Sequence, residues 1–119
     1  MSDLVMERAG VPILVCADEG TLIAGPQDAL DLIGAAYART DVVALPVSRL
    51  DERFFELQTG VAGEIMQKFT NYRIRLAIVG DIGAHVEASA SMRALVSETN
   101  RGAQIWFVAD LAELDARLG

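Results

Sequence analysis

Residues 54–81 read FFELQTGVAGEIMQKFTNYRIRLAIVGD, and this segment predicts a long helix that leads directly into a buried strand. In its first part apolar side chains recur every four residues, which places them on one helical face. The members of this stripe are Leu57, Val61, Ile65 and Phe69, widened by Phe54 and Met66. The continuous apolar run at residues 76–79 then predicts a strand covered on both faces. We expect this strand to be the central and most buried one.

The composition is that of one globular domain spanning residues 1–119. With 52% hydrophobic residues the chain can form a core without disulfides, and its single cysteine, Cys16, excludes an internal one. A net charge of −7, with Lys68 as the one lysine, disfavours binding to nucleic acid, which depends on neutralising phosphates. Residues 1–10 do not resemble a signal peptide, and no apolar run is long enough to cross a membrane. We therefore expect a cytoplasmic protein that does not engage membranes.

Apolar runs alternate with helical patterns along the rest of the chain. Strands are predicted at residues 4–7, 11–17, 42–45 and 104–108, and helices at residues 26–39, at 88–100 and after Asp110. This alternation favours right-handed crossovers and a mainly parallel sheet. The first two strands, joined by a tight turn, are expected to be antiparallel. The predicted fold is α/β, with a central mixed, mainly parallel sheet of four to five strands and four helices packed on it.

Three local features refine this prediction. Residues 48–53 form a polar connection between the third strand and the long helix. Gly102, in the sequence Asn-Arg-Gly, is placed for a left-handed helix end. Asp110 and Glu113 have the spacing of a capping box, which predicts the start of the last helix.

The chain resembles a bacterial family of domains of unknown function, number 4180. The residues that carry the resemblance are the segment 54–81, NRG at 100–102 and WFVADL at 106–111. The resemblance covers nearly the whole chain. It implies a family without implying an activity.

The order of elements is also similar to that of the STAS domain, the fold of anti-sigma-factor antagonists and of the cytoplasmic tail of sulfate transporters. STAS switches carry a Ser-Gly or Thr-Gly pair at the helix after the third strand, and Thr59-Gly60 takes that place here. The alignment needs a few additional residues near 51–55, and Gln58 stands where STAS domains have an acidic residue. The resemblance implies a STAS-like regulatory module. Because the sequence shows no nucleophile, no metal-ligand set and no cofactor loop, we expect a module that is not an enzyme. Such a module binds a protein partner and is switched by phosphorylation near Thr59.

Two structural roles are open for the segment around Thr59. Its hydroxyl could carry a phosphate at the start of a helix, where the backbone dipole favours an anion. Alternatively, Thr59 lies inside the helix or in its first turn and its hydroxyl bonds back to the chain. Gly60 and Gly63 are too sparse for a phosphate loop. Their small size instead indicates close approach of the helix, either to the sheet or to a partner.

Acidic residues follow several of the predicted strands. Asp18, Asp51, Asp81 and Asp110 could share one rim of a parallel sheet, where a magnesium or aspartyl-phosphate site would form. The sequence lacks the lysine after the last strand that phosphoreceiver proteins use. Asp110 is better explained as a helix cap, and Asp51 lies far into a loop. We therefore predict no metal and no cofactor.

His85, the one histidine, provides an alternative enzymatic hypothesis. It follows a strand end and could act as a general base oriented by Asp81. The sequence offers no nucleophile elbow near it. Cys16 lies in an apolar strand without a neighbouring cation and is expected to behave as a small hydrophobic side chain. We accordingly assign no catalytic residue, and keep Asp81 with His85 as the alternative.

Phe54 and Phe55 suggest self-association. Consecutive residues of a helix or strand cannot both face the core, so one ring should be exposed. Adjacent exposed aromatic rings are enriched where proteins meet, which makes a homodimer through Phe55 a hypothesis. The alternative is that the loop from Asp51 folds back over the second ring.

Overall fold

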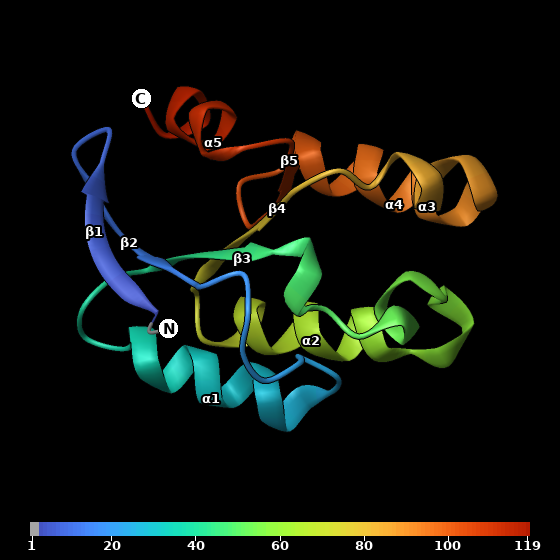
Figure 1. Cartoon of the computed structure of the whole chain (residues 1–119), viewed down its shortest axis with the longest axis horizontal. Helices are drawn as coiled ribbons and strands as arrows, with labels where there is room; N and C mark the ends of the chain where they lie inside the picture. The colour runs from blue at the N-terminus through green and yellow to red at the C-terminus, as the bar shows by residue number, and fades with distance from the viewer. Residues whose placement is uncertain (1–2) are drawn as a thin grey trace.

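The computed structural model describes residues 3–119 (Figure 1). Five strands are formed: β1 (Leu4–Arg8), β2 (Val11–Val15), β3 (Val42–Pro46), β4 (Arg75–Val79) and β5 (Ile105–Val108). The helices are α1 (Pro26–Ala36), α2 (Val61–Asn71), α3 (Gly83–Ala88), α4 (Ala90–Arg101) and α5 (Leu111–Leu118). Short 3-10 turns connect β3 to α2: η1 (Val47–Arg49), η2 (Glu52–Phe55) and η3 (Leu57–Thr59).

The strands form one mixed sheet in the order β1-β2-β3-β4-β5. β1 pairs with β2 in antiparallel register, and β2 to β5 are parallel to their neighbours. Ala9 and Gly10 join the first pair with φ angles of 51° and 78°, the positive values that a tight hairpin turn of this hand requires. The predicted α/β class and the mainly parallel sheet are confirmed.

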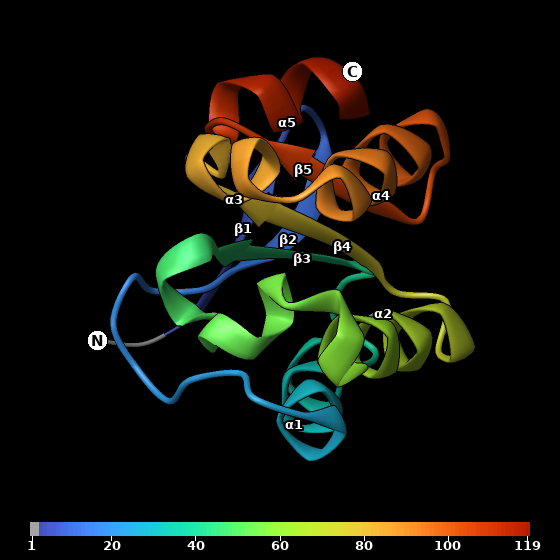
Figure 2. The ribbon, with the colours of Figure 1, turned by 90° about the vertical axis from the view of Figure 1, so that its right-hand side faces the viewer.

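The helices cover the two faces of the sheet unequally. Because consecutive strands are neighbours, crossovers of one hand bring α1, α2 and α4 to the same face. The core on this first face is built around Phe54, Ile65, Phe69, Leu76, Ile78 and Met92. On the second face, α5 is the one helix of residues 3–119 that packs against the strands, with Leu114 fully buried. Figure 2 shows α1 and α2 side by side, on the far side of the strands from α5.

The central strand is β3 rather than β4. β3 is third of five in the sheet, and its residues 42–45 are each at most 1% exposed. In β4, which lies one strand further out, both end residues are half-buried and only residues 76–78 are buried. The prediction that residues 76–79 form the most buried strand was therefore wrong by one strand. The prediction failed because the crossovers set the order of the strands in the sheet. The hydrophobicity of one apolar run does not show which strand is central.

The long helix predicted from Phe54 onward is wrong in its first part. The α-helix begins only at Val61, and residues 52–59 form the separate turns η2 and η3. At Gly60 the φ angle is 81°, a left-handed conformation that cannot be part of a right-handed helix, so the helical geometry is broken there. Asp51 stabilises the earlier turn, because its carboxylate accepts the backbone N–H of Arg53 at 3.0 Å.

The helix predicted at residues 88–100 is confirmed as α4, and a separate short helix, α3, lies directly before it. Ser89 is extended and separates α3 from α4, and its hydroxyl caps α4 by accepting the N–H of Met92 at 3.1 Å. The predicted left-handed end at Gly102 is also wrong, since Gly102 has φ −90° and ψ −166°. The Asp110 cap is confirmed, because its carboxylate accepts the N–H of Glu113. The Glu113 carboxylate accepts the N–H of Ala109, one residue before the N–H that a capping box uses.

Candidate functional site

Thr59 lies at the surface, immediately before α2. It is the last residue of η3, and Gly60 after it forms the N-cap of the helix. The hydroxyl lies 2.8 Å from the carbonyl oxygens of both Arg53 and Glu56, and its single proton can serve one of them at a time. The same oxygen accepts the N–H of Val61 at 3.3 Å. The side chain therefore links the end of η2 to the first turn of α2.

The two glycines beside Thr59 have different reasons for being glycine. Gly60 needs its positive φ. Gly63 has ordinary helical geometry, is exposed, and a Cβ placed on it would meet no atom within 4 Å. Close approach of α2 to the sheet therefore does not explain Gly63. Both glycines line an open groove of about 490 Å³, together with Pro26, Glu64, Gln67 and Lys68.

Phe55 is buried, so the prediction of an exposed aromatic ring was wrong and the alternative of a covered ring holds, with α3 as the element that covers it. Phe54 is 0% exposed and Phe55 is 9% exposed, with their centroids 5.2 Å apart. The ring of His85, on α3, stacks on Phe55 at 3.8 Å with only 8° between the planes. Because η2 is neither a regular helix nor a strand, both rings can turn inward while α3 closes over the second. The homodimer expected from a Phe55 patch thereby loses its structural basis.

The structure does not bring Asp81 and His85 together as a catalytic pair. The Asp81 carboxylate accepts the N–H of Gly83 at 2.8 Å and so caps the start of α3. His85 lies against Phe55, and no hydrogen bond joins it to Asp81 in the described part of the chain. The alternative of a general base oriented by Asp81 is therefore not supported by the geometry.

The four acidic residues predicted to share one rim of the sheet do not all lie at the strand ends. Asp18, Asp81 and Asp110 follow β2, β4 and β5, at the edge where parallel strands end. Asp51 lies beyond η1, where the hydrogen bond from the Arg53 guanidinium at 2.9 Å lowers the pKa of its carboxyl. Across residues 3–119, no group of three histidine, cysteine, aspartate or glutamate side chains is arranged to hold a metal ion.

Cys16 is a buried thiol on the first face of the sheet. Its exposure is 4%, and burial, followed by the nearby Asp3 carboxylate, raises the pKa of the thiol to about 12. Because only the thiolate is nucleophilic, the native protein holds this cysteine in an unreactive form.

The alkylation rate of Cys16 tests this. At pH 8 we expect native protein to react with iodoacetamide on the order of a thousandfold more slowly than urea-unfolded protein, since so few thiols ionise. The measurement is the mass shift against time. A native rate within tenfold of the unfolded rate would contradict the burial of the thiol.

Sequence reasoning missed Arg49, the buried charged residue of residues 3–119. Its side chain donates to the carbonyl oxygens of Thr21 at 2.9 Å and Ala17 at 3.0 Å, and approaches Asp3 at 3.4 Å. The residue is 5% exposed, within the segment predicted to be a polar connection. No local pattern distinguishes it, because its partners lie about thirty residues earlier in the chain.

Comparison with known proteins identifies the family. A family described as domain of unknown function DUF4180 matches residues 8–118. The chain belongs to the DUF4180 family. No curated protein and no solved structure matches it, so the STAS resemblance stays a prediction. No helix in residues 3–119 has the length and apolar character needed to cross a membrane.

Proposed function

We propose that this DUF4180 domain is a non-enzymatic regulatory module that binds a protein partner at the surface formed by Thr59, Gly60 and Gly63. The observation that carries the proposal is the position of Gly63 in the same groove as Gly60, next to Thr59, a position that Gly34 on α1 does not share. Glycine inside a helix lowers helix stability by about 1 kcal/mol relative to alanine. Gly63 has neither a positive φ nor a close neighbour that requires glycine. Because glycine has no side chain, the backbone of a partner could come close to the helix at this point.

Thr59 provides a means of switching this surface. A kinase that transferred the γ-phosphoryl group of ATP to the hydroxyl would remove the proton that it now shares between two carbonyl oxygens. It would also add nearly two negative charges beside the first turn of α2, where backbone N–H groups without helical partners favour an anion. The hydroxyl could no longer donate to Arg53 and Glu56, so η3 and the adjoining groove would rearrange.

A partner-capture experiment with matched glycine variants tests the surface. Gly63→Leu places a side chain in the groove, and we expect it to lower recovery of a specific partner from cells of the source at least fivefold, about 1 kcal/mol. Gly34→Leu is the control, because Gly34 is also helical, exposed and free of neighbours within 4 Å. Quantitative mass spectrometry of the captured proteins gives the ratio. Equal recovery with both variants would remove Gly63 from any interface.

Thr59 variants test the switch on the same captured partner. Thr59→Glu adds a charge at the position of the phosphate and is expected to lower recovery, with the melting temperature preserved. Thr59→Val removes the hydroxyl without adding charge, so it separates the charge effect from loss of the three hydrogen bonds. If every partner were recovered equally with wild type and Thr59→Glu, Thr59 would have a purely structural role.

A further inference from the structure

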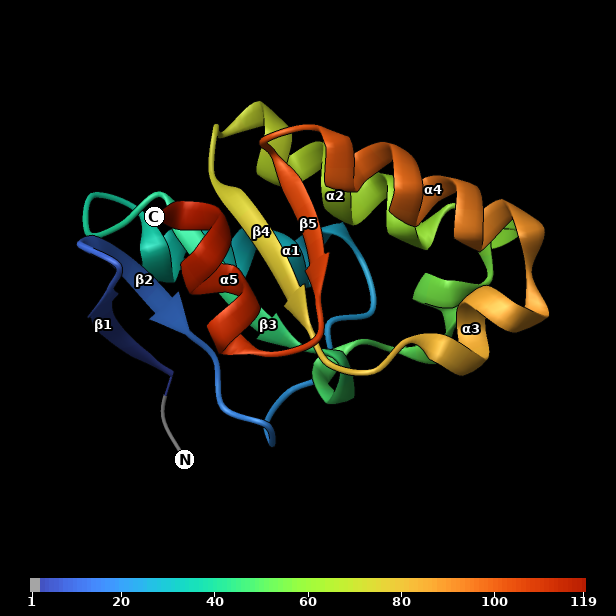
Figure 3. The ribbon, with the colours of Figure 1, turned by 90° about the horizontal axis from the view of Figure 1, so that it is seen from above.

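The second face of the sheet is incompletely covered. Parallel strands are normally covered on both faces, yet α5 is the one helix that packs on this face in the described chain. Figure 3 looks onto it, with α5 in front of the strands and α1 behind them. The bidentate ion pair between Arg8 and Asp115, with both contacts at 2.8 Å, fixes α5 to the end of β1. The carboxyl ends of β2, β3 and β4 are left without a helix above them.

A trough of about 490 Å³ occupies this uncovered area. Its lining is mostly apolar and includes Val15, Ala44, Pro46, Val79 and Leu111, while the carboxylates of Asp18 and Glu19 belong to its polar part. Two exposed apolar residues of β1 extend the same face, because Leu4 pairs in register with Val15 and Met6 with Ile13. The volume lies within the range of small-molecule sites, which also occur at the carboxyl ends of parallel strands.

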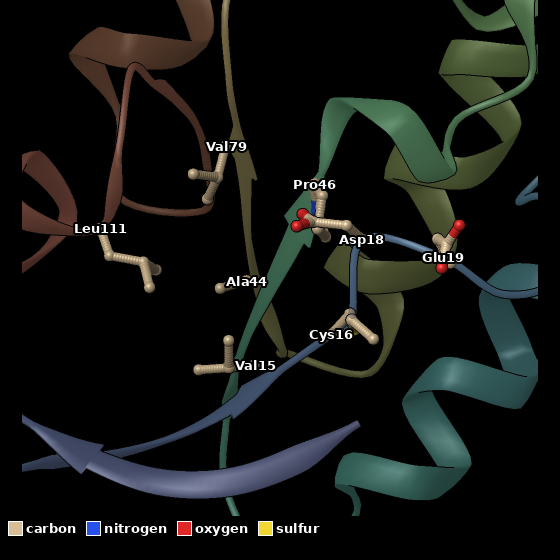
Figure 4. A pocket seen from close by; sticks show the side chains of 9 residues that line it. Val15, Cys16, Asp18, Glu19, Ala44, Pro46, Val79 and Leu111 are labelled. Atoms are coloured by element: carbon tan, nitrogen blue, oxygen red, sulfur yellow. The ribbon is translucent and has the colours of Figure 1, made fainter. Parts of the chain in front are cut away.

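The mouth of the trough is acidic. Figure 4 shows the Asp18 carboxylate turned toward the side on which Ala44 and Val79 lie, whereas Glu19 points away. No lysine or arginine lines the trough. Within residues 3–119 no hydrogen bond or ion pair engages the Asp18 carboxylate; the hydroxyl of Ser48 binds its backbone carbonyl instead. The nearby cation, Arg49, is bound to Ala17, Thr21 and Asp3.

We propose that the trough binds a small amphiphilic cation, with an apolar body over Ala44 and Val79 and an ammonium or guanidinium group paired with Asp18. An anion would find no cationic partner in the lining. A second copy of the chain would bring a net charge of −7 toward another −7 and place acidic rims near each other. The site is independent of the proposed partner surface, because α2 packs on the other face of the sheet.

An NMR titration of the full chain with three probes that share a phenylethyl body tests the site. The probes are 2-phenylethylamine, 2-phenylethanol and 3-phenylpropionate, which are cationic, neutral and anionic at pH 7. We expect saturable shifts of the Ala44, Val79 and Val15 methyl signals with the amine. Binding of the alcohol should be about fivefold weaker, the value of one solvent-exposed ion pair, and binding of the carboxylate weaker still.

Charge variants in the same loop separate a specific pair from general attraction to an acidic protein. Asp18→Asn should weaken binding of the amine about fivefold, so that the amine and the alcohol bind with the same affinity. Glu19→Gln makes the same change in net charge on a lining side chain whose carboxylate points away, and should weaken binding of the amine less than Asp18→Asn does. Ala44→Leu should fill the floor and abolish binding of all three probes. If that variant does not fold, the comparison of Asp18→Asn with Glu19→Gln decides.

Three results would overturn the proposal. One is equal affinity of the wild type for the amine and the alcohol. Another is shifts that avoid the Ala44 and Val79 methyl signals, or no saturable shifts. The third is a dimeric mass by light scattering that Ala44→Leu converts to a monomer, which would assign the face to a second copy of the chain.

Discussion

Ile78→Asp is expected to abolish folding. Ile78 is 1% exposed, lies in β4 with paired strands on both sides, and packs into the core between the sheet and its helices. The substitution removes a buried side chain, which costs about 2–5 kcal/mol, and adds a carboxylate without a partner, which costs several more. The sum is comparable to the whole stability of a domain, about 5–15 kcal/mol. Circular dichroism should show no cooperative thermal transition.

Two controls show whether the effect belongs to the buried charge. Ile78→Val keeps the site apolar and should lower the free energy of unfolding by only about 0.5–1.5 kcal/mol. Ser97→Asp places the same charge on the exposed side of α4 and should change it by less than about 0.5 kcal/mol. A wild-type spectrum and melting temperature for Ile78→Asp would mean that β4 does not lie in the interior.

The architecture could be predicted because short local sequence patterns determine where its strands and turns lie. Each strand of the parallel part is a run of four or five apolar residues that ends near a proline, glycine or aspartate, and each run was found within two residues of its observed end. The hairpin needed only Ala9-Gly10, and the last helix needed only Asp110 with Glu113. These signals depend on backbone conformation and burial over a few neighbouring residues.

The segment before α2 could not be predicted in the same way. The period of four that connects Leu57 to Val61 is continuous in the sequence, but the chain leaves helical geometry at Gly60 between them. A glycine inside such a period is compatible with both outcomes. Tertiary packing favours the turns over a helix. With the turns, Phe54 and Phe55 are both buried, and a single continuous helix would not allow this.

The contacts that shape the candidate sites are likewise long-range. The stacking of His85 on Phe55 joins residues thirty positions apart, and it changes an expected interface into a buried pair. The trough depends on where α5 crosses the sheet, which no pattern in the last helix specifies. Sequence analysis found Thr59, Gly60, Gly63 and Asp18, but their surroundings come from packing.

Arg49→Met is expected to lower the free energy of unfolding by about 3–5 kcal/mol, the usual cost of removing one partner from a buried charged network. The guanidinium donates to two carbonyl oxygens of the segment after β2 and approaches Asp3 at 3.4 Å. Methionine fills a similar volume but leaves those carbonyl oxygens buried without a donor. Gly20 belongs to the same arrangement, because a Cβ there would lie 2.9 Å from the Arg49 Cζ atom.

Urea unfolding measures this effect, and two further variants identify its cause. Arg49→Lys keeps the charge but not the forked donor geometry, so its loss should be intermediate. Arg101→Met removes an arginine that is 74% exposed and paired at the surface with Glu98, and should cost less than about 0.5 kcal/mol. Hydrogen exchange should accelerate at residues 17–23 in Arg49→Met, because the side chain holds that segment against η1. A loss below about 1 kcal/mol with unchanged exchange would mean that the segment is held by its apolar contacts, such as Ile23, and not by the buried guanidinium.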